Sequence, residues 1–168
     1  LAIAQWGPRK NIENTVKWFI EECYDQDVGL VLKTNIRKNS ISDRYATEHK
    51  ISEVLQNYPD RKCKIYLIHG DMTEQEMAGL YTHPKIKHLV TLTHGEGFGL
   101  PIFEAVCHGM PVMAPDWGGQ CDFLYAPVKK GKVKKNKAMF SKVSYTIAPI
   151  PESAVWEGVL HPQSNWCY

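Results

Sequence analysis

A glycine-rich segment near the middle of the chain holds the residues best suited to chemistry. Gly95, Gly97 and Gly99 lie within five positions of one another, and glycines let a backbone approach a ligand closely. A helix is predicted to begin directly afterwards at Leu100, with Pro101 in its first turn, where no N–H is needed. Free N–H groups at a helix start bind anions. The segment therefore predicts a site for a phosphate or a diphosphate.

Two carboxylates flank this anion site. Glu96 lies in the turn, and Glu104 lies in the helix that follows, so both side chains can face one cleft. Such a pair suits hydroxyl groups at the two ends of a diphosphate, a sugar at one end and a ribose at the other. The competing interpretation is a dinucleotide fingerprint, because Asp116 follows at a suitable distance. That fingerprint requires a third glycine where this chain has Leu100.

Further residues extend the Glu96-x7-Glu104 motif on both sides. It lies within Gly95-Glu96-Gly97-Phe98-Gly99-Leu100-Pro101-x-x-Glu104-Ala105, followed by Gly109-x-Pro111-Val112 and Gly118-Gly119. This pattern resembles the C-terminal domain of retaining GT-B glycosyltransferases of family 4 (glycosyl transferases group 1), as far as about Leu124. The resemblance implies that Glu96 holds hydroxyls of a donor sugar and Glu104 holds the ribose. It assigns the diphosphate to the amides of Phe98, Gly99 and Leu100, with Gly97 in the same donor site.

The same family has a basic pair near the start of this domain that neutralises the leaving diphosphate. The lysine of this pair is matched by Lys10 within Arg9-Lys10-Asn11. The arginine is not matched, because Ala4-Gln5 stands where the family usually has Gly-Arg. Either Arg9 or Lys33, at the end of the second predicted strand, is expected to supply the other charge. The resemblance implies that Lys10, Arg9 and preorganised N–H groups stabilise charge building on the β-phosphate, with neither metal nor cofactor.

The resemblance also implies transfer of a hexose from a nucleoside-diphosphate sugar to a glycan, lipid or protein acceptor. The acceptor would be held largely by an N-terminal domain that this chain lacks, so residues 1–168 are expected to be the nucleotide-sugar-binding domain of a longer protein. Two alternatives stay open, namely a sugar-nucleotide epimerase of similar fold and a non-catalytic nucleotide-binding module. Backbone around residues 67–72 is expected to contact the base, so side chains do not predict which base is bound.

Composition narrows the class of protein. The chain is 43% apolar and 23% charged, which is ordinary for one globular domain, and its apolar runs are too short to span a bilayer. A net charge of +2 gives no reason to expect nucleic acid. The five cysteines are scattered and contain no CxxC pair, so neither a disulfide framework nor a zinc ribbon is expected, and a cytoplasmic setting is the simplest.

Lysines and histidines give weaker signals. Residues 125–142 are predicted to form an exposed loop, with six lysines between positions 129 and 137; a solvated surface is the first interpretation and a peripheral membrane contact the second. His69, His94 and His108 lack metal-ligand spacing. His94 borders the predicted anion site, which makes it a candidate contact for the acceptor or the sugar.

Strands and helices alternate along the chain in a way that would position these residues. Short apolar runs alternate with helical patterns, which predicts an α/β fold with a Rossmann-like, doubly wound parallel sheet. Thr73 and Glu76 form a predicted capping box, and Ser40 or Ser42 is expected to cap a helix. The predicted strands are 1–6, 29–34, 64–69, 88–93, 111–114 and 142–148, and the predicted helices are 11–24, 42–56, one from 73, 100–108 and 151–157.

Overall fold

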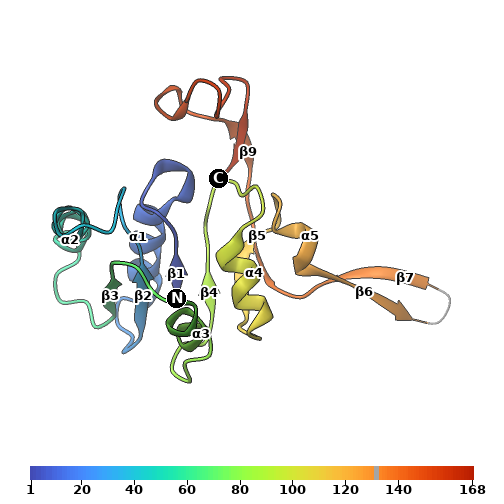
Figure 1. Ribbon diagram of the computed structural model, residues 1–168, viewed down its shortest axis with the longest axis horizontal. Helices are drawn as coiled ribbons and strands as arrows, with labels where there is room; N and C mark the ends of the chain where they lie inside the picture. The colour runs from blue at the N-terminus through green and yellow to red at the C-terminus, as the bar shows by residue number, and fades with distance from the viewer. Residues whose placement is uncertain (131–132) are drawn as a thin grey trace.

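The computed structural model describes residues 1–130 and 133–168. A parallel sheet forms its centre, in two halves that have the strand orders β3-β2-β1 and β4-β5-β8. The Val90 N–H donates to the Leu1 carbonyl at 2.8 Å, which places β4 beside β1. Figure 1 shows β3, β2, β1, β4 and β5 side by side in this order. The strands are β1 (Ala2–Ile3), β2 (Gly29–Lys33), β3 (Lys64–Ile68), β4 (Leu89–Val90), β5 (Val112–Pro115) and β8 (Ser141–Val143).

This strand order confirms the predicted Rossmann-like, doubly wound fold. The chain winds outward from β1 to β3, crosses over, and then winds outward from β4 to β8. The order therefore reverses between β1 and β4. In open α/β sheets, ligands bind in the crevice beyond the carboxyl ends of the strands at such a reversal point.

Helices cover both faces of the sheet. Ala2, Leu30 and Leu32 pack in one apolar cluster with α1 and α2, whereas Leu1 and Leu89 pack in another with α3 and α4. Leu1 and Ala2 are adjacent yet serve opposite clusters, because successive side chains of a strand point to opposite faces. The helices are α1 (Ile12–Cys23), α2 (Ile41–Leu55), α3 (Glu74–Tyr81), α4 (Leu100–Cys107) and the short α5 (Cys121–Leu124).

Two predicted helix starts are confirmed. The Ser40 hydroxyl accepts the Asp43 N–H, so Ser40 rather than Ser42 caps α2. Thr73 and Glu76 form the predicted capping box of α3, in which each side chain bonds the other residue's N–H. Within the described residues, no helix has the length and apolarity needed to cross a bilayer.

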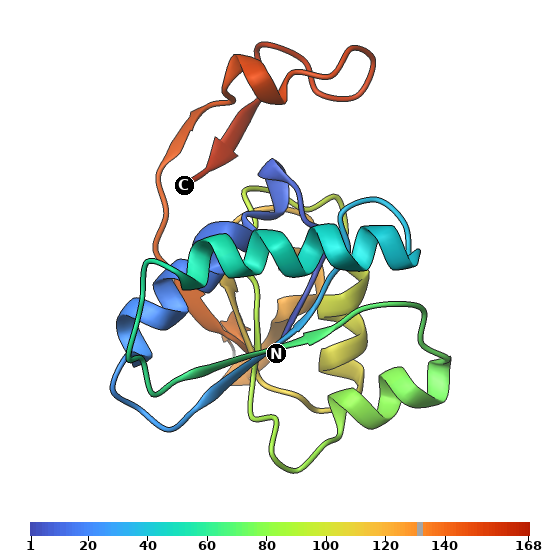
Figure 2. The same cartoon turned by 90° about the vertical axis from the view of Figure 1, so that its left-hand side faces the viewer.

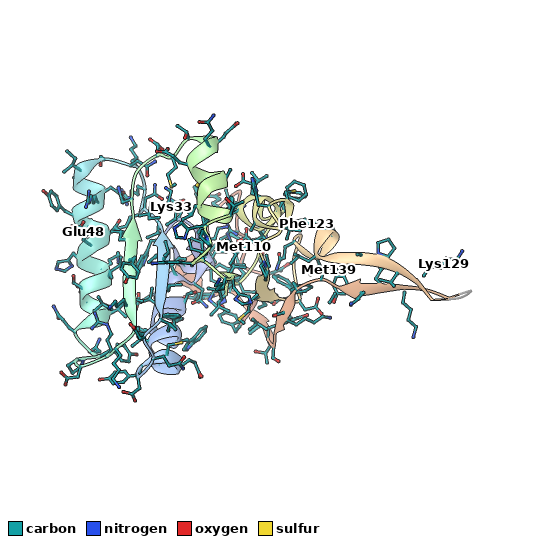
Figure 3. All side chains as sticks on the ribbon, turned by 90° about the horizontal axis from the view of Figure 1, so that it is seen from below. Lys33, Glu48, Met110, Phe123, Lys129 and Met139 are labelled. Carbon is teal, nitrogen blue, oxygen red and sulfur yellow. The ribbon has the colours of Figure 1, made fainter. Side chains whose placement is uncertain are left out.

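The prediction of a loop at 125–142 is wrong. This segment forms an antiparallel hairpin of β6 (Tyr125–Lys130) and β7 (Val133–Ala138), which projects from the body of the protein (Figure 1). Lys129 lies far out along it and Phe123 lies near its base (Figure 3). The strands were not predicted because the segment shows no alternation of apolar and polar residues, which a two-stranded ribbon does not need. Of the six lysines at positions 129–137, Lys132 lies outside the described residues.

The segment that follows the hairpin also differs from prediction. The expected strand at 142–148 divides into β8 and β9 (Ile147–Pro149), and β9 pairs antiparallel with β10 (Asn165–Cys167). The helix expected at 151–157 is a single 3-10 turn, η2 (Glu152–Ala154). Residues 147–168, here called the C-terminal arm, rise beyond one end of the sheet (Figure 2). Two predicted strands, at 1–6 and 88–93, shorten to two residues each because the chain turns into loops.

Candidate functional site

Two loops meet at the reversal point of the sheet. The loop after β1 forms a 3-10 turn, η1 (Pro8–Lys10), and the loop after β4 leads into α4. The Arg9 carbonyl accepts the His94 N–H at 2.8 Å and the Thr93 hydroxyl at 3.1 Å. The Asn11 side chain donates to the Leu92 carbonyl at 3.0 Å. These bonds hold the basic pair directly beside the glycine-rich turn.

The structure brings together Lys10, Arg9 and Glu96. The Lys10 ammonium lies 2.6 and 2.8 Å from the two carboxylate oxygens of Glu96. The Arg9 guanidinium lies 3.5 Å from the same carboxylate and donates to the Gly95 carbonyl. Only 8% of the Glu96 side chain is exposed, against 38% for Arg9. Two cations thus surround one buried carboxylate, and the net positive charge of the cluster favours an anion nearby.

Glycines shape the turn that carries Glu96. The Gly119 N–H donates to the Glu96 carbonyl at 2.9 Å, and a Cβ atom on Gly119 would lie only 1.8 Å from the Gly97 carbonyl oxygen. Gly118 has a φ of +105°, which L-residues rarely adopt. The Gly118-Gly119 pair therefore supports the turn from behind, which is a physical reason for the second glycine motif. A Cβ on Gly97 would meet no atom within 4 Å, so this residue faces open space.

The start of α4 offers free N–H groups. Gly99 precedes the helix with a φ of 87°, and no side chain caps it. Pro101 occupies its first turn, as predicted. Within the described part of the chain, the amides of Phe98 and Leu100 donate no hydrogen bond, and both residues are exposed. Such amides attract an anion, because helix starts carry unpaired donors and positive partial charge.

Glu104 is held by a partner that sequence analysis missed. The Tyr81 hydroxyl, on α3, donates to a Glu104 carboxylate oxygen at 2.8 Å. Burial, together with the adjacent carboxylate, raises the pKa of Tyr81 far above its usual value, so the phenol stays a donor. Nothing in the sequence signals this contact, since Tyr81 occupies an ordinary helix position. Glu104 therefore lies on the α3 side of α4.

Lys33 does not reach Glu96. Its ammonium donates to the Gly70 carbonyl at 2.5 Å, and burial lowers its pKa. Arg9, rather than Lys33, is thus the cation that accompanies Lys10 at the carboxylate. Lys33 and Lys10 nevertheless line one cavity of about 320 Å³ that crosses the reversal point, hereafter the first cavity. Its other walls come from Ile3, Ala4, Gln5, Thr34, Asn35, Asn39 and Pro101.

A second cavity, of about 430 Å³, lies between η1 and the C-terminal arm, and sequence analysis missed it. Gln5 and Lys10 belong to both cavities. The arm is anchored at its β10 strand, where the Cys167 N–H donates to the His94 carbonyl at 3.0 Å. The second cavity is lined by Gln5, Gly7, Pro8, Arg9, Lys10, Ser153, Ala154, Val155, Trp156, Leu160 and Trp166.

The histidines singled out in the sequence have structural partners. His94 is buried, donates from Nδ1 to the Cys167 carbonyl at 2.6 Å and stacks on Trp166. The His69 ring bonds the Asp43 carboxylate at 3.0 Å, and His108 stacks on Tyr81. Within residues 1–130 and 133–168, no group of three or more His, Cys, Asp or Glu residues is arranged to hold a metal ion.

Asp116, the carboxylate of the dinucleotide alternative, is already engaged. The Lys142 ammonium donates to it at 2.6 Å, and the Tyr125 hydroxyl donates at 2.7 Å. The hydrogen bond from Lys142 is the main cause that holds the pKa of Asp116 below its usual value, with Tyr125 contributing. This ion pair ties β5 to β8 and to the base of the hairpin, which is a structural role.

Comparisons with known proteins give a distant structural similarity. No protein-family model matches the sequence, and a search of the curated proteins finds no match. Among solved structures, the chain is similar to a chain of the GtfA/B complex, with 19% sequence identity and a TM-score of 0.45. The similarity covers 95% of this chain and 26% of that one, so this chain spans about a quarter of its length. The fold is that of a Rossmann-like α/β domain, and its candidate site lies at the reversal point of the sheet.

Proposed function

We propose that this chain binds the donor of a retaining glycosyltransferase, a nucleoside-diphosphate hexose, at the reversal point of its sheet. The observation that carries the proposal is the cluster of Lys10, Arg9 and Glu96 beside the free amides that open α4. A buried carboxylate paired with two cations at a helix start is expensive to assemble. Binding of a phosphorylated ligand that also carries hydroxyl groups gives every member of the cluster a role.

The diphosphate would lie against the amides of Phe98, Gly99 and Leu100, with Lys10 and Arg9 on its other side. Glu96 would accept hydrogen bonds from hydroxyls of the hexose, and Glu104 would accept them from the ribose. The Tyr81 hydroxyl leaves the second oxygen of Glu104 available for that contact. Gly97 faces open space, which gives the ligand room to approach the backbone. Lys33 and the residues around Gly70 border the side where the base would lie.

The chemical step would follow from the placement of these charges. The bond between the anomeric carbon and the β-phosphate oxygen breaks, and its electron pair leaves with the nucleoside diphosphate. The acceptor hydroxyl oxygen bonds the anomeric carbon, and its proton passes to the departing phosphate. Lys10 and Arg9 would stabilise the charge that grows on the phosphate, which is where preorganised cations contribute most. Transfer to a glycan, lipid or protein acceptor, with an N-terminal domain and without a metal, belongs to the same proposal.

Nucleotide binding tests the proposal directly. In titration calorimetry with UDP, GDP and ADP, one nucleotide should bind, and Lys10→Ala and Glu104→Ala should each weaken it about tenfold or more. Tyr81→Phe should weaken it less, by about two- to tenfold, because it removes the hydrogen bond that positions Glu104 but leaves the carboxylate in place. Lys17→Ala is the matched control, since Lys17 bonds Glu13 on the surface of α1. Failure of all three nucleotides to bind would overturn the proposal.

A further inference from the structure

The C-terminal arm builds a second cavity against the basic turn. One wall consists of residues 5 and 7–10, from the loop after β1. The opposite wall comes from the arm, with Trp156, Leu160 and Trp166 as its large apolar members. The two strands of the arm, β9 and β10, pair with each other, and the bonds between Cys167 and His94 attach the arm to the body of the protein. The cavity is thus formed by two anchored segments rather than by one loop alone.

The two cavities meet at Lys10. Lys10 and Gln5 line both of them, whereas Lys33 and Pro101 belong only to the first and Trp156 only to the second. Under the proposed function, the first cavity belongs to the donor, and Lys10 lies where its β-phosphate departs. The second cavity therefore adjoins the donor cavity at Lys10. A group-transfer site needs a place for its second substrate at this position.

The lining of the second cavity is apolar on one wall and polar on the other. Trp156 is 66% exposed and Val155 is 36% exposed. Large apolar side chains that cluster at such exposure usually mark a binding surface. The polar side chains of the lining are those of Arg9, Lys10 and Gln5; Lys10 bonds Glu96, and Gln5 donates to the Ile36 carbonyl at 2.7 Å. A pyranose ring matches both walls, because its C–H face is apolar and its rim carries hydroxyl groups. Tryptophan combines a large flat surface with few rotatable bonds, which suits such stacking.

We infer that the second cavity is the acceptor subsite and that it takes a sugar, stacked on Trp156 with its hydroxyls toward Arg9 and Gln5. This inference rests on the proposed function, because the cavity can be an acceptor subsite only if the chain also binds the donor. It assigns part of acceptor recognition to the arm of this chain. The acceptor hydroxyl would then approach the anomeric carbon past Lys10, and the bonds would change as described for the donor.

A ¹H–¹⁵N titration of the chain with methyl α-glucopyranoside, methyl α-mannopyranoside and methyl α-galactopyranoside tests this inference. At least one glycoside should shift the Trp156 indole signal and leave the Trp18 signal in place, since Trp18 is exposed on α1. Trp156→Ala should weaken that binding about tenfold or more, Trp156→Phe should retain most of it, and Trp18→Ala should change nothing. Nucleotide affinity should stay the same in all three variants.

The outcomes separate this inference from the proposed function. If a nucleotide binds but no glycoside does, or if Trp156→Ala and Trp18→Ala bind glycoside equally, the acceptor subsite is refuted and donor binding stands. If glycoside binds at Trp156 but excludes the nucleotide, the two cavities are not a donor and acceptor pair, and the inference is again refuted. Glycoside binding without any nucleotide binding refutes the acceptor role together with the proposed function.

Discussion

Lys10 and Glu96 form a two-point ion pair, at 2.6 and 2.8 Å, across 86 positions of sequence. The pair joins the loop after β1 to the loop after β4, which are the two sides of the reversal point. Its carboxylate is almost fully buried, and 22% of the Lys10 side chain is exposed. The pair therefore couples the stability of the domain to the geometry of the candidate site.

Breaking this pair from one side should cost stability. Lys10→Met leaves the buried Glu96 carboxylate with only the more distant Arg9, and we expect a loss of about 1–3 kcal/mol in the free energy of unfolding. The double variant Lys10→Met/Glu96→Gln should lose less than the sum of the single variants, because a neutral amide needs no cation. Urea denaturation of the four proteins measures the coupling. Additive losses would show that the ion pair does not form in solution.

Gly119 should be the least replaceable glycine of the candidate site. Its Cβ would meet the Gly97 carbonyl oxygen at 1.8 Å, which is backbone rather than a mobile side chain. Gly119→Ala should therefore destabilise the protein by about 2 kcal/mol or more. Gly79→Ala is the control, because Gly79 lies within α3 with open space around it, and it should stabilise by about 0.5–1 kcal/mol. Similar melting temperatures for the two variants would refute the tight contact.

Asp43 should contribute to stability against acid. Burial alone would raise its pKa, but hydrogen bonds from the ring of His69 and from three backbone N–H groups outweigh burial and hold the pKa well below its usual value. A carboxylate whose pKa is lower in the folded state stabilises the fold above its unfolded pKa and loses that contribution as pH falls below about 4. The N–H groups belong to Ile36, Arg37 and Lys38.

Thermal melts between pH 7 and pH 3 test this role. The melting temperature of the natural chain should fall steeply at the acid end, whereas Asp43→Asn should start lower and fall less. Asp27→Asn is the control, since 91% of the Asp27 side chain is exposed. It should follow the natural chain throughout. An unchanged acid slope in Asp43→Asn would contradict the assignment.

The hairpin should be separable from the candidate site. Lys129, Lys135 and Lys137 are exposed on it, and Lys135 and Lys137 lie opposite Val128 and Ala126. Reversing all three charges to Glu should change stability by no more than about 0.5 kcal/mol per residue and leave nucleotide affinity unchanged. Co-sedimentation with phosphatidylserine vesicles should fall, because each lysine near an anionic surface contributes about 1 kcal/mol.

Charge reversal elsewhere provides the comparison. The triple variant Lys38→Glu/Lys62→Glu/Lys85→Glu changes the net charge equally at exposed positions outside the hairpin. It should keep more of the vesicle binding than the hairpin variant. Equal losses would mean that overall charge, rather than the hairpin, governs the contact. If single-stranded RNA competes with the vesicles, the hairpin is a general polyanion site.

Sequence predicted most of the fold because local and global signals agree in it. Val16 and Ile20 recur at helical spacing and are fully buried in α1, and Leu30 and Leu32 mark a buried strand. The β6–β7 hairpin escaped prediction because its lysines carry no apolar alternation. The C-terminal arm escaped it because β9 and β10 are short and pair across an irregular segment.

The sequence motifs name candidate site residues but do not show which of them are in contact. Glu96, Lys10 and Arg9 could be named from their motifs, but their contact depends on β1 and β4 being neighbours, which is a property of the whole sheet. Lys33 looked equivalent to Arg9 in sequence, yet it bonds Gly70. Trp156 could not be found, because a single tryptophan in a polar segment carries no signal of what it faces.

The anchoring of β10 has a consequence for how the domain folds. The bonds between His94 and Cys167 close a loop whose ends are 73 positions apart. Contacts this distant in sequence are slow to form, because the chain must lose the entropy of a long loop before the contact can stabilise it. The wall that carries Trp156 should therefore be completed after β1, β2 and β3 have paired, because the partners in these strands lie only 30 to 35 positions apart. Refolding chains should acquire amide protection at Leu30 and Leu32 before they acquire it at Cys167.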